Sequence, residues 1–309
     1  MSTDPLLTDS DSSDLMESDV VSERAAAVFS PSTRRRGRPR NVLFWIAVGW
    51  IGLIIFGALF ANVLPLPSQA QAVGPPRMPP FHHFANGELL GTDTFGRSNL
   101  ARAVYGARNS LLIAVTASVI GVVIGGFVGL ASGYLRGWTD RVSSFIVDTL
   151  LAFPALILLL TVSAVLGPKA STVLIALSLL VVPSFVRIER GAALSWSQRP
   201  FVLAARSYGS SEWRIAVRHV LPNSMLTLVS VMPTLIAGLI VAEGALSYLG
   251  EGIPSPNASW GVMISDGQSV LQIAPAVVFV PAAFVFLTVF SFNVIGGQAR
   301  TRLESRGRA

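Results

Sequence analysis

The sequence predicts an all-α integral membrane protein with six transmembrane helices and a cytoplasmic helical hairpin. Hydrophobic residues make up 51% of the 309 residues and charged residues only 13%, whereas about a quarter of a typical soluble domain is charged. Several apolar runs reach the length of about 20 residues that a helix needs to cross a bilayer. The arginines gather beside these runs, as residues that set membrane topology do.

Composition also excludes several classes of function. The absence of cysteine rules out disulfides and cysteine-based metal sites. Lys169, the only lysine, follows Pro168, whereas a Walker A phosphate loop needs a lysine directly after a glycine. We therefore expect no ATPase activity and no cofactor in this chain. The net charge of +6 is read as a topology signal and not as a sign of nucleic-acid binding.

The first 40 residues are expected to form a cytoplasmic tail. Residues 1–30 are polar, Ser-rich and acidic, and a segment of this composition cannot bury enough apolar area to fold alone. Five arginines follow between residues 34 and 40. The layout differs from that of a signal peptide, so the first apolar run is predicted to stay as an anchor.

Six membrane spans are predicted in order. They cover residues 42–63, 110–134, 145–166, 171–187, 225–249 and 273–295, so that 41–63 is the first transmembrane helix and 110–297 a five-helix core. Prolines inside several spans predict kinks. In the second span Gly121, Gly125 and Gly129 keep a four-residue spacing, which predicts close helix packing within the chain or with a partner.

The connections follow from these spans. Residues 64–109 form an extracytoplasmic loop with a proline-rich, extended first half. Its second half has helical periodicity and is predicted to be an amphipathic helix in the outer interface. Because the arginines cluster before the first span, near the hairpin and in the tail 298–309, both termini are predicted to be cytoplasmic.

The segment 200–222 is predicted to form a hairpin of two short helices. Pro200 suits the first position of a helix. Gly209 can take the left-handed conformation that closes this helix, and Ser210 can cap the next one. Pro222 is expected to end the second helix. The positive-inside distribution places the hairpin in the cytoplasm.

The spacing within this hairpin resembles the EAA loop of ABC-importer permeases, in which two alanines precede a glycine and a Leu-Pro ending. Leu203 stands where that family has its glutamate, so the resemblance implies the hairpin without a salt bridge from that position. The matching residues, which the resemblance assigns to coupling with an ATPase together with Arg206, Arg214 and Arg218, are Ala204, Ala205, Gly209, Leu221 and Pro222.

A second stretch is similar to the outer-loop signature of the dipeptide/oligopeptide/nickel branch of these permeases. Its residues are Gly91, Thr92, Asp93, Gly96 and Arg97. The stretches 140–154 and 246–267 agree as well, and the resemblance, which is to the second of two permease subunits, covers roughly 91–295. It implies the fold of an ABC type I importer permease.

The resemblance implies a function and partners. The chain would form half of a translocation path for di- or oligopeptides in a bacterial plasma (inner) membrane. Its partners would be a second homologous permease subunit, two cytoplasmic ATP-binding subunits and an extracytoplasmic substrate-binding protein. ATP and Mg would be bound by the ATPase subunits. Transport would proceed by alternating access, with the hairpin as a rigid lever.

Individual residues keep two interpretations each. Ala204 and Ala205 would fit an ATPase groove, while the three hairpin arginines would either pair with the ATPase or act as positive-inside anchors. An acidic residue in a span should face protein or water, so Glu243 and Asp148 either line the path or form structural pairs. Asp93 and Arg97 would position the outer loop or meet the binding protein.

Two alternatives remain open beside peptide import. A permease for nickel or another small solute would look nearly the same. An ATP-independent secondary transporter would instead show internal repeats with broken helices, and the sequence shows no such repeat. The adjacent His82 and His83 make a weak metal site, and we expect no catalytic constellation and no metal centre.

Overall fold

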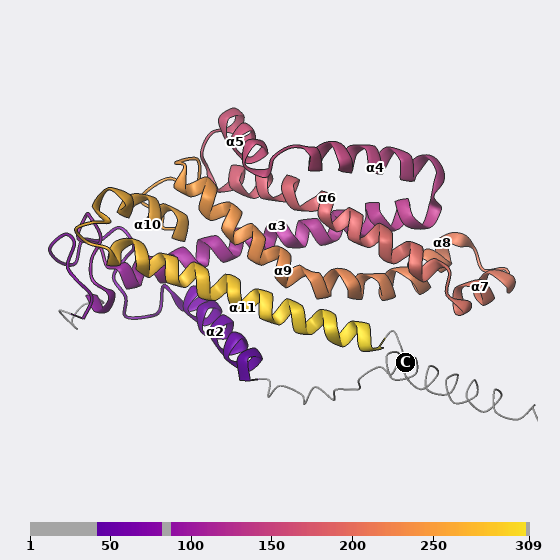
Figure 1. Ribbon diagram of the computed structural model, residues 1–309, viewed down its shortest axis with the longest axis horizontal. Coiled ribbons are helices and arrows are strands. Elements are labelled where there is room, and N and C mark those ends of the chain that lie inside the picture. The colour runs from indigo at the N-terminus through magenta and orange to yellow at the C-terminus, as the bar shows by residue number, and fades with distance from the viewer. Residues whose placement is uncertain (1–41, 82–87, 307–309) are drawn as a thin grey trace, which may run out of the picture. The chain divides into compact units, whose positions relative to one another are not determined.

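The computed structural model describes residues 42–81 and 88–306, which are mostly helical (Figure 1). Extended pairing in this part is limited to two isolated bridges, Ala72 with Arg97 and Thr92 with Ser98. Five of the described helices are long and apolar enough to cross a membrane, and a bent pair makes six if it forms one span. The predicted all-α membrane fold is confirmed. The predictions for the N-terminal tail and for His82 and His83 lie outside the described residues.

Two groups of helices make up the described part. The spans are α2 (Val42–Phe60), α3 (Asn99–Leu135), the pair α4 (Gly137–Ala152) and α5 (Ala155–Leu166), α6 (Ala170–Ser197), α9 (Leu221–Tyr248) and α11 (Ala276–Arg306). The shorter elements are 3-10 turns at Glu88–Leu90 and Gln268–Val270, α7 (Pro200–Ser207), α8 (Glu212–Ile215), a π-helical turn at Ala216–Val220, and α10 (Trp260–Gly267).

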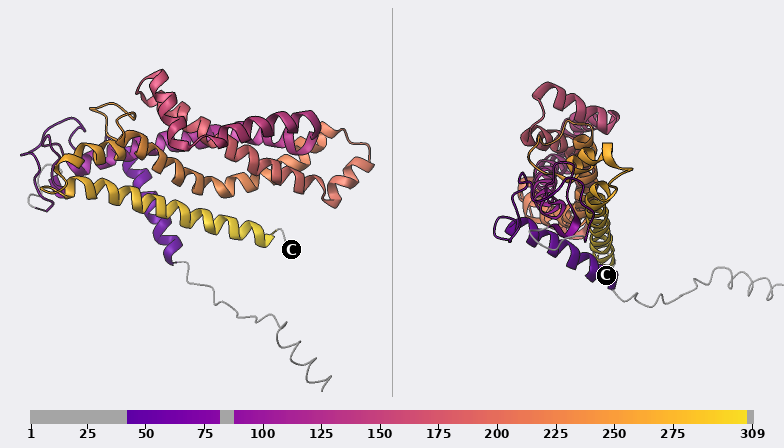
Figure 2. Two further views of the ribbon diagram at one scale, coloured as in Figure 1. Left: turned by 45° about the horizontal axis from the view of Figure 1, so that its top comes forward. Right: turned by 90° about the vertical axis from the view of Figure 1, so that its left-hand side faces the viewer.

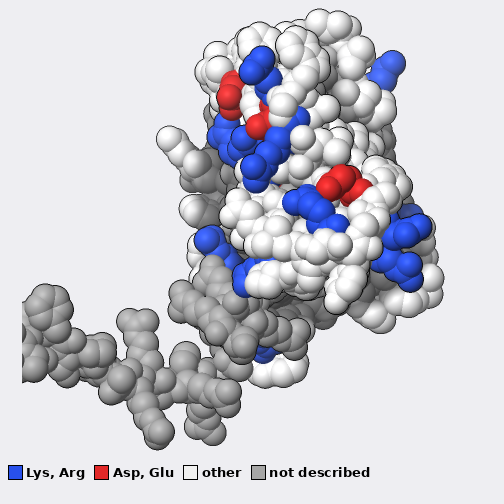
Figure 3. All heavy atoms as spheres, turned by 90° about the vertical axis from the view of Figure 1, so that its right-hand side faces the viewer, with Lys and Arg blue, Asp and Glu red and all other residues white. Residues whose placement is uncertain are grey.

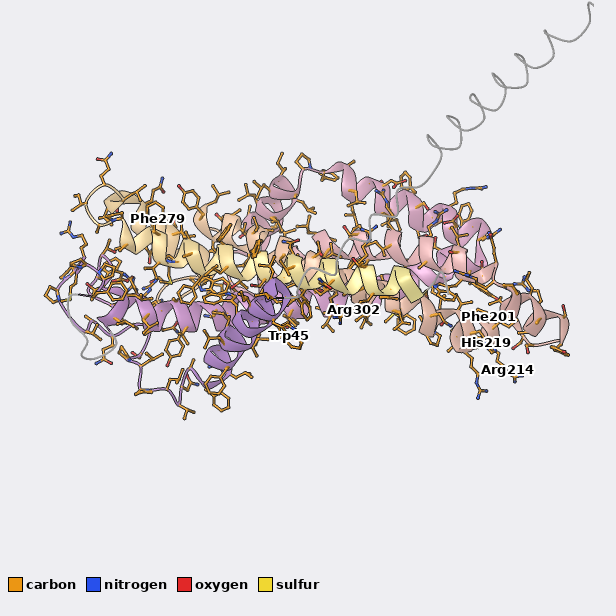
Figure 4. The ribbon with its side chains drawn as sticks, turned by 60° about the horizontal axis from the view of Figure 1, so that its bottom comes forward. Trp45, Phe201, Arg214, His219, Phe279 and Arg302 are labelled. Carbon is orange, nitrogen blue, oxygen red and sulfur yellow. The ribbon has the colours of Figure 1, made fainter. Side chains whose placement is uncertain are left out.

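The long helices lie side by side, with α3, α6 and α9 in mutual contact and α11 packed on α9 and α2 (Figures 1 and 2). Helices α7 and α8 lie at one end of this bundle, and α10 lies with the outer loop at the other (Figure 1). Large apolar side chains such as Trp45 on α2 and Phe279 on α11 remain exposed (Figure 4). Helices with such outward apolar surfaces are suited to contact lipid or a partner subunit.

Glycines bring α3 and α6 together within the chain. A Cβ atom added to Gly129 would lie 2.6 Å from both the Cβ of Glu189 and the carbonyl oxygen of Val186. Gly125 and Gly133 face the backbone of α6 in the same way. The predicted close packing therefore joins two spans of one chain, as small residues do in membrane helices.

The third span departs from the prediction of one helix over 145–166. Helices α4 and α5 meet at 91°, and the break falls at Phe153 and Pro154. The ring of a proline disfavours the α conformation for the preceding residue, and Phe153 is extended, with φ −75° and ψ 133°. Pro183, in contrast, lies inside the continuous helix α6.

The predicted helix in the second half of the outer loop is confirmed from Asn99 onward, but its separate place in the outer interface is wrong. Helix α3 begins at Asn99, after the N-cap Ser98, and its first turns belong to the same helix as the predicted second span. The indole of Trp260 on α10 donates a hydrogen bond of 3.0 Å to the carbonyl of Ala103. Because α10 packs on these turns, Arg102 is buried with 1% exposure instead of facing solvent.

Helix α11 is longer than its predicted span and continues to Arg306, through most of the tail assigned to 298–309. A helix of 31 residues is about 46 Å long, whereas the hydrocarbon core is about 30 Å thick. The C-terminal turns of α11 therefore extend beyond the length that a span requires.

Candidate coupling hairpin and polar clusters

Helices α7 and α8 form the predicted hairpin, with Pro200 in the first turn of α7. Gly209 has a φ of 75°, so the predicted left-handed conformation is confirmed. Its N–H donates to the carbonyl of Arg206, and the N–H of Ser210 donates to the carbonyl of Ala205. These two bonds are the pattern with which a left-handed glycine closes a helix.

Two local predictions about the hairpin are wrong. The residue before α8 is Ser211, not Ser210, and its side chain makes no capping bond. Pro222 does not end the second helix, because it lies in the first turn of α9. The π-helical turn joins α8 to α9, and the N–H of Leu221 donates to the carbonyl of Ala216, five residues back. The hairpin is therefore continuous with the fifth span.

An apolar cluster holds the inner face of the hairpin. This hairpin cluster contains side chains from α3, α6, α7, α8 and the π-helical turn, namely Leu130, Tyr134, Ala193, Val202, Ile215, Ala216 and Val220. Burying apolar side chains of this size stabilises their arrangement by about 1.5–3 kcal/mol for each large one. The cluster fixes the hairpin against the ends of two spans.

The outer face of the hairpin is apolar and basic. Tyr208 is 90% exposed and Trp213 is 72% exposed. Arg214, which projects from the hairpin in Figure 4, and Arg218 are also exposed and have no ion pair among the described residues. Figure 3, which looks at the hairpin end, shows basic side chains gathered there with few acidic ones. Exposed apolar groups of this kind mark interaction sites.

Arg206 behaves differently from the other two arginines. Its Nε and Nη2 donate to the carboxylate of Glu212 at 2.7 and 2.9 Å. These bonds raise the pKa of Arg206 above its ordinary value. The same carboxylate accepts a hydrogen bond from the hydroxyl of Tyr134. Neither Tyr134 nor Glu212 was predicted as a site residue, because they are 78 positions apart and no local pattern connects them.

The outer-loop signature builds its own loop. Gly91 has a φ of 74°, and Gly96 has a φ of 76°. The hydroxyl of Thr92 donates to the carbonyl of Pro75 at 2.5 Å and accepts from the N–H of Met78 at 2.9 Å. Asp93 accepts hydrogen bonds from the backbone N–H groups of residues 95 and 97. The spacing of the signature thus follows from the turn that it forms.

The loop is tied to α3 and α10 by a cluster of four charges. Asp93 pairs with Arg97 at 2.6 Å and with Arg102 at 3.2 Å, and Asp266 of α10 pairs with the same arginines at 3.3 and 3.0 Å. Arg102 and Asp266 were not predicted, because they are 164 positions apart. Asp93, Arg97 and Arg102 are buried, which favours the loop-positioning interpretation.

Glu243 lies inside the bundle, with 1% exposure. Its carboxylate accepts hydrogen bonds from Ser110 of α3 at 2.9 Å and from Ser247 at 2.7 Å. Ser259, the N-cap of α10, contacts Ser247 at 3.4 Å. A buried carboxylate with such partners fits the structural interpretation better than that of a group lining the path.

Asp148 has an exposed partner instead. Its carboxylate accepts a hydrogen bond of 2.6 Å from Arg187 of α6, and the two side chains are 66% and 60% exposed. The pair neutralises two charges beside apolar helix surfaces. Within the described residues no three His, Asp or Glu side chains are grouped as metal ligands would be.

The sequence matches a family model described as "Binding-protein-dependent transport system inner membrane component" over residues 103–306. This range contains the hairpin, Glu243, Asp148 and Asp266 and, apart from the first turn of α3, all spans after the first, whereas Asp93, Arg97 and Arg102 lie before it. The chain belongs to this family of membrane components of transport systems.

Individual relatives agree with this assignment. The chain is 36% identical to the glutathione transport system permease protein GsiD of Pectobacterium atrosepticum over 217 residues, which are 70% of this chain and 72% of that protein. It is 36% identical to the dipeptide transport system permease protein DppC of Alkalihalophilus pseudofirmus over 264 residues, 83% of this chain and 85% of that one.

A solved structure supports the fold. The chain resembles a protein in the crystal structure titled as an amino acid ABC transporter with histidines, with a TM-score of 0.52 and 20% identity. The match covers 65% of this chain and 94% of the other. At this identity the likeness concerns the fold alone, and it confirms the expected ABC permease architecture.

Proposed function

We propose that this chain is a permease subunit of an ATP-driven importer of di- or oligopeptides. Its relatives are named as dipeptide and glutathione transport system permeases, and both of these solutes are peptides. In this proposal the chain forms half of the translocation path in a bacterial plasma membrane. A second homologous permease forms the other half, and an extracytoplasmic protein delivers the solute.

The single observation that supports coupling to an ATP-binding subunit is the exposed outer face of the hairpin. Tyr208 and Trp213 are exposed on a hairpin whose inner face is packed against two spans. An apolar projection braced in this way is suited to enter a groove on another protein. We assign that groove to one of two separate ATP-binding subunits, which would hold ATP and Mg.

Individual roles follow from the geometry. Ala204 is exposed on α7 and Ala205 is half-buried, so Ala204 offers a small surface to the groove. Arg214 and Arg218 are the arginines that would meet acidic groups of the ATPase. Leu221 and Pro222 would carry motion into α9, because they lie in its first turn.

Co-purification with a transport assay tests this proposal. The tagged chain is extracted from its native host in mild detergent, its companions are identified by mass spectrometry, and the complex is placed in liposomes. A second permease, ATP-binding subunits and ATP-dependent uptake of a labelled dipeptide are expected. Uptake of nickel but not of peptides would refute the solute class. Uptake by the chain alone without ATP would refute coupling to an ATPase.

A further inference from the structure

We infer that Tyr134 is a positioning residue that makes α3 move with the hairpin. The inference rests on the proposed coupling of the hairpin to an ATPase. The hairpin has covalent connections to α6 and α9, which precede and follow it in the chain. Helix α3 has no such connection. The hydroxyl of Tyr134, near the end of α3, provides a polar link to the hairpin instead.

The link has a defined geometry. The Glu212 carboxylate accepts from the Tyr134 hydroxyl and from two N–H groups of Arg206. Arg206 belongs to α7 and Glu212 to α8, so this ion pair closes the turn at Gly209 from one helix to the other. The hairpin is therefore braced internally and held to α3 at the same carboxylate.

The exposure of the three side chains shows how much each contributes to the attachment of the hairpin to α3. The Arg206 and Glu212 side chains are 47% and 53% exposed, and exposed ion pairs contribute little by themselves. Tyr134 is buried, and its ring belongs to the hairpin cluster. A hydrogen bond to a charged acceptor is stronger than one between neutral groups. The hydroxyl thus makes a charge-assisted and partly buried contact, and its donor is a side chain that the apolar cluster holds in place.

Motion of α3 would reach the rest of the bundle. Gly129 and its neighbours pack α3 directly on α6. At the same end Ser132 of α3 donates to Asp140 of α4 at 2.6 Å, and Arg190 of α6 donates to the same carboxylate at 2.5 and 2.8 Å. Helices α3, α4 and α6 are thereby joined near the hairpin. Without the Tyr134 hydroxyl the hairpin would keep its apolar contacts with α3 and α6 but lose its charge-assisted link to α3, so the end of α3 would follow the hairpin less tightly.

A matched pair of variants tests this link. Tyr134→Phe removes the hydroxyl and keeps the ring in the hairpin cluster. Tyr248→Phe is the control, because this exposed tyrosine lies at the far end of α9 and its hydroxyl makes no hydrogen bond to the residues that the structure describes. The chain has no cysteine, so spin labels can be placed at Val123→Cys in α3 and Ser211→Cys in the hairpin. All variants are studied in the complete complex in liposomes.

Two readouts separate the outcomes. We expect Tyr134→Phe to broaden the distribution of distances between the labels. We also expect it to lower the solute carried per ATP hydrolysed by about three- to tenfold, the effect of one typical intramolecular hydrogen bond, because the Glu212 acceptor is half-exposed, while hydrolysis continues. Tyr248→Phe should change neither.

An unchanged distance distribution and an unchanged ratio in Tyr134→Phe would overturn the inference, as would a fall in complex yield with an unchanged ratio. The distance measurement does not depend on transport. A wild-type complex that hydrolyses ATP without importing peptide would therefore contradict the proposed function, while the label distances would still decide the inference.

Discussion

At the scale of single residues, Glu243 illustrates how a buried carboxylate in a span can be structural. Its two oxygens accept from Ser110 and Ser247, and all three side chains are buried. Leaving a buried hydroxyl without a partner costs about 1–3 kcal/mol. The function of Glu243 would then be to hold α3 against α9.

We predict that Glu243→Leu lowers the thermal midpoint of the purified complex, because both serine hydroxyls lose their acceptor. Glu243→Gln, which keeps an acceptor and a donor of the same shape, should retain most of the stability and of the peptide uptake. Thermal unfolding and uptake are measured for both variants. A Gln variant of normal stability that no longer transports would contradict the structural role and place Glu243 in the path.

The outer charge cluster is the second case at this scale. Asp266 is the partner on α10 of both Arg97 and Arg102, and removing one member of a buried pair leaves an uncompensated charge, which costs about 3–5 kcal/mol when burial is complete. Since Asp266 is partly exposed, Asp266→Asn should cost less than this but still loosen α10. The measurement is limited proteolysis, and we expect the loop between α9 and α10 to be cleaved faster in the variant than in the wild type. Proteolysis at the wild-type rate would mean that the charge cluster is not needed to hold α10 in place.

The site residues could be predicted only where a local pattern carries them. Gly209 and Pro200 occupy positions that the short sequence around them defines. Tyr134 and Asp266 take part through contacts across 78 and 164 positions. No periodicity in one sequence reveals such a pair, because the partners are chosen by how the helices pack.

At the scale of elements, the turn of the hairpin depends on one glycine. Gly209 has a positive φ, and no atom would contact a Cβ added there. A substitution therefore acts through backbone strain of about 1–2 kcal/mol and not through a clash. Asparagine tolerates this conformation better than β-branched residues do.

We predict that Gly209→Val leaves membrane insertion intact while peptide uptake and uptake-coupled ATP hydrolysis fall. Gly209→Asn should retain clearly more of both. The amount of assembled complex, uptake and ATP hydrolysis are measured for each variant. Wild-type uptake by Gly209→Val would remove the assignment of this glycine to the coupling turn.

The packing of α3 on α6 gives the next prediction at this scale. A methyl group at Gly129 would lie 2.6 Å from atoms of α6, whereas nothing lies within 4 Å of a methyl group at Gly238 of α9. Overpacking of this kind costs about 1–3 kcal/mol. Gly129→Ala should therefore lower the thermal midpoint, and Gly238→Ala should leave it nearly unchanged. Equal thermal midpoints for the two variants would mean that α3 and α6 can move apart to admit the methyl group without a loss of stability.

Prolines show why element boundaries were harder to predict than element types. Pro154 breaks a span at 91°, whereas Pro183 and Pro233 lie within continuous helices. The ring acts in the same way on each preceding turn, but the neighbouring helices decide whether the backbone continues. Likewise the helical periodicity before residue 110 predicted a separate amphipathic helix, but α10 packs on these turns of α3 and Arg102 is buried there.

At the scale of the whole bundle, α3 and α9 both run from the hairpin end to the end that holds the outer loop and α10. The charge cluster at the start of α3 and the Tyr134 link near its end lie on one helix of 37 residues. Helix α9 likewise begins at the hairpin. Near its other end, Glu243 is hydrogen-bonded to Ser247, which contacts the N-cap of α10. A displacement of the hairpin would therefore reach the opposite end through α3 and α9, as alternating access between two sides of a membrane requires.

That mechanism needs the hairpin to face the cytoplasm, and the absence of cysteine makes this orientation testable. Ser211, directly before α8, and Gln71 in the outer loop are exposed, and the segments to which they belong lie at opposite ends of the bundle (Figure 1). We predict that a membrane-impermeant maleimide labels Gln71→Cys in intact spheroplasts and Ser211→Cys only in inverted vesicles. The arginine distribution requires this result, because basic loops stay on the cytoplasmic side. Labelling of Ser211→Cys from the outside would place the hairpin away from ATP, and an ATPase could then not be its partner.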